Sequence, residues 1–124
     1  MTDLTDIQNY LTTLLRSYQP SLRVTIDTTE KFEVTGTIPT MQGKKKVDGF
    51  YFASVVRKPK DVRFYFFPIY THEQALHPLS TDLKKALKGK SCFHIKKMDD
   101  AFQNNLKELI QKSVALYRKD GLLS

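Results

Sequence analysis

The chain has 124 residues, of which 40% are hydrophobic and 27% are charged, a composition typical of one globular domain with its own core. The single cysteine, Cys92, excludes an internal disulfide, and no apolar run approaches the ~20 residues of a membrane-spanning helix. Because the sequence opens at Met1 without the basic and apolar segments of a secretory signal, we expect a cytoplasmic protein that does not associate with membranes.

Apolar residues at three- and four-residue steps predict an amphipathic helix over residues 3–18, with Thr2 as its N-cap and Pro20 preventing its continuation. The apolar period then changes to two, which predicts an antiparallel hairpin over residues 22–26 and 32–38. We expect Gly36 to mark a bulge in this hairpin.

Residues 39–48 are polar and basic and predict a loop. Two strands are expected next, over residues 49–57 and 62–67, and because both are apolar on both faces we expect them at the centre of the sheet. Strict alternation in the first strand places Phe50, Phe52 and Val56 on one face and Tyr51, Ala53 and Val55 on the other. In the second strand, Arg63, Tyr65 and Phe67 oppose Val62, Phe64 and Phe66.

The last third of the chain predicts two helices and a strand between them. Thr71 and Gln74 have the spacing of a capping box for a short helical turn through residue 76, and Ser80 can cap a helix over residues 81–88 that ends at Gly89. A strand is expected over residues 92–96, and the final helix runs from Asp99 or Asp100 to Gly121. The order α-β-β-β-β-α-β-α predicts a single α+β domain over residues 1–124, with helices packed on a mostly antiparallel sheet.

The net charge of +7 is carried by the middle of the chain. Residues 43–97 contain thirteen basic and four acidic side chains, a net charge of +9, whereas residues 1–42 carry −2 and residues 98–124 carry zero. Clustered positive charge attracts anions, so we expect an anionic small molecule or an acidic macromolecule as the partner. The alternative is that the charge serves solubility alone.

The segment of residues 89–97 carries the candidate binding residues. In a strand, Cys92 and His94 point to one face while Phe93 and Ile95 enter the core. If that face also carries the tyrosines and the arginine of the central strands, it forms a partly aromatic, partly cationic surface for a small anion. The predicted site residues are Tyr51, Arg63, Tyr65, Lys90, Ser91, Cys92, His94 and Lys96. The alternative reading is that Cys92 and His94 are only packing residues.

No motif assigns a catalytic residue, a metal or a cofactor. His94 is a possible base for a Cys92 nucleophile, but neighbours two apart on a strand are ~6.5 Å apart along the backbone, which is long for a hydrogen bond. The three histidines and Cys92 lack the spacing of a zinc site, and Gly89-Lys90-Ser91 lacks the upstream glycine of a phosphate-binding loop. Nucleic acid is a minor alternative partner, because aromatic residues and lysines occur without a recognition motif.

Three segments resemble the YdhG-like family of bacterial domains of unknown function: residues 47–53, 63–71 and 87–97. The likeness covers residues 44 to about 121, and the string Gly-Lys-Ser-Cys-Phe-His-Ile-Lys from Gly89 is its most specific part. The resemblance implies a small cytoplasmic α+β domain, and some members are described as frataxin-like iron chaperones. Iron delivery is therefore the first alternative to a non-enzymatic module for an anion, and a cysteine-dependent enzyme is the second.

Overall fold

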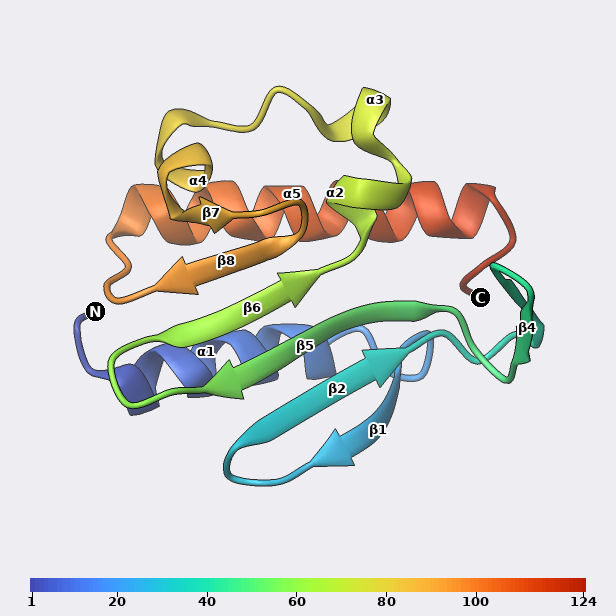
Figure 1. Cartoon of the computed structure of the whole chain (residues 1–124), viewed down its shortest axis with the longest axis horizontal. Helices are drawn as coiled ribbons and strands as arrows, with labels where there is room; N and C mark the ends of the chain where they lie inside the picture. Colours follow the sequence, from blue (N-terminus) through green and yellow to red (C-terminus); the bar gives the residue numbers. More distant parts are fainter.

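One antiparallel sheet of six strands organises the computed structural model, which describes residues 1–124 (Figure 1). The strand order is β1-β2-β5-β6-β8-β7, and β3 and β4 form a separate hairpin. The strands are β1 Arg23–Asp27, β2 Lys31–Thr35, β3 Thr40–Gln42, β4 Lys45–Val47, β5 Tyr51–Arg57, β6 Val62–Phe66, β7 Leu87–Lys88 and β8 Cys92–Ile95. The helices are α1 Leu4–Arg16, α2 Pro68–Thr71, α3 Glu73–Leu76, α4 Thr81–Ala86 and α5 Asp100–Lys119. The predicted α+β class, with a helix at each end, is confirmed.

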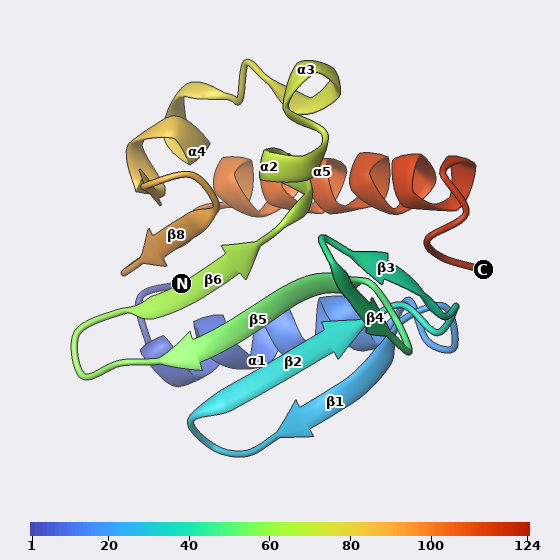
Figure 2. The same cartoon turned by 45° about the vertical axis from the view of Figure 1, so that its right-hand side comes forward.

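The two long helices lie behind the same face of the sheet in both views (Figures 1 and 2). The helix expected over residues 3–18 is present as α1, but its N-cap is Asp3 rather than Thr2, because the Asp3 carboxylate accepts a hydrogen bond from the Asp6 amide at 3.1 Å. Asp99 caps α5 in the same way, through the Phe102 amide. No helix is long and apolar enough to cross a bilayer.

The two strands expected at the centre of the sheet, β5 and β6, are its third and fourth strands. The β2–β5 register shifts between Val34, which pairs with Ala53, and Thr35, which pairs with Tyr51, so Phe52 is an extra residue on β5. This bulge turns the Phe52 ring toward the buried Tyr117 of α5, with a centroid distance of 5.4 Å.

The bulge makes strict alternation in β5 a wrong prediction. Ala53 and Val55 pair with the buried Phe66 and Phe64 of β6, so they lie on the helix-covered face. Phe52 joins them there, whereas Val56 pairs with Arg63 on the opposite face. The irregularity expected at Gly36 lies one step earlier in the register, between residues 34 and 35.

Several short elements differ from the expectations. The predicted loop over residues 39–48 contains the hairpin β3–β4, whose turn begins at Gly43 with a φ of +62° (Figure 2). Met41, Lys45 and Lys46 of this hairpin are exposed. Polar strands of three residues lack the apolar alternation that identifies a strand in a sequence. The expected capping box at Thr71 is absent, because Thr71 ends α2. The helix expected through residue 88 ends at Ala86, and β7 follows it.

A close backbone contact between Gly36 and Gly49 yields a stability prediction. An alanine Cβ at Gly49 would overlap the carbonyl oxygen of Gly36, whose own amide is bonded to the Phe50 carbonyl at 2.9 Å. Gly49→Ala should lower the free energy of unfolding by about 3 kcal/mol, because the two segments cannot separate without breaking this bond. Urea denaturation measures the change.

Gly43→Ala is the matched control, because Gly43 has a positive φ but no atom within 4 Å of the added Cβ. It should cost roughly 1 kcal/mol, from the backbone conformation alone. An equal loss of stability in both variants would contradict the role of the Gly36–Gly49 contact.

Candidate functional site

The face of the sheet opposite the helices carries a row of paired polar side chains. Glu33 pairs with Ser54, Ser54 with Tyr65, and Tyr65 with Cys92, across β2, β5, β6 and β8. Directly paired residues project from the same face, so these four side chains form one line across the sheet. Tyr51 joins the line, because its hydroxyl lies 2.6 Å from that of Ser54. The predicted common face of Tyr51, Tyr65 and Cys92 is present.

Arg63 and His94 form a second pair on this open face, next to the first row. Both side chains are directed at Asp61, with Arg63 Nε 3.3 Å from one carboxylate oxygen and His94 Nδ1 3.7 Å from the other. The Asp61 side chain is only 10% exposed. The expected cationic surface is therefore largely neutralised by a carboxylate that the sequence placed in an ordinary turn.

Burial favours the uncharged forms of two side chains in the row, the Tyr51 hydroxyl and the Cys92 thiol. Burial raises the pKa of Tyr51 to about 12, and the hydrogen bond with Ser54 offsets this only in part. Burial also raises the pKa of the Cys92 thiol, although nearby Tyr65 and Arg63 oppose the shift. A thiol with a raised pKa is a weak nucleophile, and His94 is directed at Asp61.

The other three predicted site residues lie away from this row. Lys90 and Ser91 belong to the turn between β7 and β8, where the Lys90 ammonium lies 5.7 Å from the centre of the Tyr70 ring. Lys96 follows the end of β8. The structure therefore divides the eight predicted residues among three places instead of one surface.

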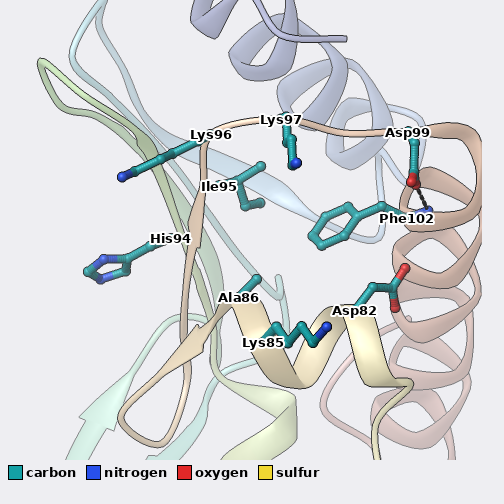
Figure 3. A pocket seen from close by; sticks show the side chains of 9 residues that line it. All are labelled: Asp82, Lys85, Ala86, His94, Ile95, Lys96, Lys97, Asp99 and Phe102. Carbon is teal, nitrogen blue, oxygen red and sulfur yellow. Dashed lines mark hydrogen bonds between the residues drawn. The ribbon is translucent and has the colours of Figure 1, made fainter.

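A cavity of about 570 Å³ opens between α4, the end of β8 and the start of α5 (Figure 3). Ile95 and Phe102 are buried and lie between Lys85 and Lys97 in this view, whereas His94 projects from the other side of β8. We call this cavity the α4–β8 cleft. It is lined by Asp82, Lys85, Ala86, His94, Ile95, Lys96, Lys97, Asp99 and Phe102.

The exposed edge of β8 forms one wall of the α4–β8 cleft. Four consecutive residues, 94–97, line the cleft. Because neighbouring side chains on a strand point to opposite faces, consecutive residues can all line a cavity only if the backbone edge of the strand faces it. β7 covers this edge only opposite Cys92 and Phe93. The backbone N–H and C=O groups of Lys96 and Lys97 make no hydrogen bond within the chain.

The carboxylates that line the cleft are already engaged. Asp82 accepts hydrogen bonds from the Ser80 hydroxyl, the Leu83 amide and the Asn105 side chain at 2.6–3.1 Å. Burial would raise the pKa of the Asp82 carboxyl, but these hydrogen bonds together lower it below its ordinary value. Asp99 accepts from the Phe102 amide.

The three lysines of the cleft are uncompensated, because Lys85, Lys96 and Lys97 form no ion pair with any carboxylate. The charges of Lys85 and Lys97 are therefore free to attract an anionic ligand in the cleft, whereas Lys96 projects from the same side of β8 as His94 (Figure 3). Of this set, only Lys96 was predicted as a site residue. Lys85 and Phe102 come from helices distant in sequence, so no local spacing indicates that they meet Lys97.

No group of three or more His, Cys, Asp or Glu side chains is close enough together to hold a metal ion. Iron delivery stays a prediction from the resemblance alone. A scan against protein-family models, a search of curated proteins and a search of solved structures each gave no significant match. Membership of the YdhG-like family stays a prediction from the sequence.

The half-buried Tyr51 and the buried Tyr117 predict a pH dependence of stability. Burial raises the pKa of Tyr51 and that of Tyr117 from 10.0 to about 12, so the folded state favours their neutral forms. Their contribution to stability is complete below pH 10 and should be lost as the pH rises to about 12. Urea denaturation across this range measures the loss, and tyrosinate absorbance reports the titration.

Tyr51→Phe and Tyr117→Phe should each remove part of the late rise in tyrosinate absorbance. A late phase that is undiminished in both test variants would show that other tyrosines produce it.

Proposed function

We propose that the chain is a non-enzymatic binding module for a small amphipathic anion held in the α4–β8 cleft. The observation that carries the proposal is the contrast between the charged groups of the cleft: its two carboxylates are hydrogen-bonded within the chain, whereas its three lysines have no partner. We also propose a cytoplasmic location and a relationship to the YdhG-like family, both from the sequence.

The lining of the cleft favours a ligand with one apolar and one anionic part. Ligand pockets are mostly apolar, with a few polar groups that orient the ligand. The volume of the cleft lies within the range of roughly 300–1,000 Å³ that is usual for such pockets. The apolar part would contact Ile95 and Phe102. A carboxylate or phosphate would lie near the ammonium groups of Lys85 and Lys97 and the unpaired amides at the end of β8.

The same residues favour binding without catalysis. A general base must be free to accept a proton from the ligand, but Asp82 and Asp99 already accept hydrogen bonds. His94 projects away from the cleft floor and toward Asp61 (Figure 3). Cys92 lies on the open face of the sheet, and burial raises the pKa of its thiol.

A thermal-shift screen of aromatic carboxylates and phosphorylated metabolites tests this function. A ligand at 100 times its dissociation constant should stabilise the wild type by about 2.7 kcal/mol. Lys85→Ala and Lys97→Ala should each weaken its binding about tenfold or more, because each removes a charge that faces the anion. Added salt should weaken binding further if the contact is ionic.

Lys84→Ala is the matched control, because Lys84 is the neighbour of Lys85 on α4, is exposed and does not line the cleft. Its ligand affinity should stay within about twofold of the wild type. The proposal is wrong if no anion stabilises the wild type, or if Lys84→Ala weakens binding as much as Lys85→Ala does. Binding that requires a long acidic chain would identify an acidic macromolecule as the partner instead.

A further inference from the structure

Tyr70 is the one exposed aromatic side chain among the eight phenylalanines and six tyrosines of the chain. Tyr70 is 50% exposed, and its ring stacks on Phe67 with a centroid distance of 5.7 Å and an interplanar angle of 27°. Phe67 in turn contacts Phe50 and Tyr51, so an aromatic series leads from the sheet to this ring. Tyr70 is therefore a supported, solvent-facing aromatic platform.

The turn between β7 and β8 places hydrogen-bond donors beside Tyr70. The backbone N–H groups of Gly89, Lys90 and Ser91 donate no hydrogen bond within the chain. Gly89 has a φ of +73°, which allows the tight three-residue connection. Exposed amides in a turn next to a lysine form a favourable position for a phosphate group.

A cavity of about 300 Å³ joins these two features. Its lining residues are Ile69, Tyr70, Glu73, His77, Leu87, Gly89 and Lys90. His77 Nε2 lies 3.2 Å from the Ile69 carbonyl oxygen, which can only accept, so Nε2 donates this hydrogen bond and holds the His77 ring at the cavity wall. The cavity shares no residue with the α4–β8 cleft.

We propose that this cavity binds a nucleoside monophosphate, as a second site that does not depend on the α4–β8 cleft. The base would stack on Tyr70, and the phosphate would accept hydrogen bonds from the amides of the β7–β8 turn and from Lys90. In the free protein, the Lys90 ammonium lies above the Tyr70 ring at the long end of cation–π distances. The base would take its place there, and the flexible Lys90 side chain would turn to the phosphate.

Glu73 gives the proposal a directional test. It is the only acidic side chain that lines the cavity, and it forms no ion pair. Its negative charge disfavours a nearby phosphate, so Glu73→Gln should tighten binding. A site for a cation or for an uncharged aromatic ring would show the opposite change or none.

The experiment is an amide NMR titration of the full chain with adenosine monophosphate. The signals of Gly89, Lys90 and Tyr70 should shift and saturate. Adenosine alone and inorganic phosphate alone should each bind at least about tenfold more weakly than adenosine monophosphate, because each supplies only one of the two contacts. Tetra-adenylate in a parallel titration distinguishes a nucleotide within a strand from a free nucleotide. Saturable binding of adenosine monophosphate at this site supports the proposal, whereas binding of tetra-adenylate alone would contradict it.

Tyr70→Leu, which keeps an apolar side chain, and Lys90→Ala should each weaken adenosine monophosphate binding by about tenfold. Lys58→Ala is the matched control, because Lys58 is an exposed lysine beside another hairpin turn and lines neither cavity. Amide spectra that match the wild type outside the cavity establish that each variant is folded.

Two results would overturn the proposal. The first is an absence of saturable shifts at Gly89, Lys90 and Tyr70. The second is adenosine monophosphate binding that survives Tyr70→Leu but is lost in Lys97→Ala, which would place the nucleotide in the α4–β8 cleft. Conversely, nucleotide binding that Lys97→Ala leaves unchanged would support this site even if no ligand is found for the cleft.

Discussion

One-sided burial of the sheet is the constraint on which the rest of the structure depends. Phe64 stacks between Phe66 and Phe93 on the covered face, at centroid distances of 5.3 and 6.2 Å, and all three rings are fully buried. Side chains of this size remove a large apolar area from water only if helices cover them. α1 and α5 do so from the same side, and the opposite face is left to polar residues (Figure 1). Each candidate site is therefore at the open face or at the rim of the sheet.

The short pairing of β7 explains why the cavities form at this rim. Because β7 pairs with only two residues of β8, the strand β8 continues beyond its last neighbour, and its backbone edge faces the space between α4 and α5. The turn that joins β7 to β8 lies at the other end of the same pair and faces Tyr70. One abbreviated strand therefore leaves unpaired backbone donors in two places. Unpaired donors at a sheet edge remain available to a ligand or a partner chain.

The sequence predicted α1 and α5 from their long apolar periods, and it predicted the central strands β5 and β6 because both of their faces are apolar. It could not show the bulge at Phe52, because the residues of β5 look like those of a regular strand. Only the register of β5 with β2 reveals the bulge. For the sites, period-two alternation grouped Cys92 with His94 and Tyr65 with Arg63, but only the register of β6 and β8 shows that the two groups share one face. The approach of Asp61 to Arg63 and His94, and that of Lys85 to Lys97, depends on how separate elements pack, and local spacing contains no signal for it.

Nearby carboxylates decide which of the basic side chains in this protein can attract an anion. The sequence places an excess of nine positive charges in residues 43–97, yet the structure distributes them over the β3–β4 hairpin, the turn after β5, α4 and both ends of β8. On the open face, where the sequence predicted an anion site, the Asp61 carboxylate already forms an ion pair with Arg63. In the α4–β8 cleft, which carries fewer predicted residues, the carboxylates are held by hydrogen bonds and the lysines are not. Because a surface charge attracts a ligand only to the extent that its neighbours leave it unbalanced, the cleft is the stronger candidate despite its smaller share of the sequence signal.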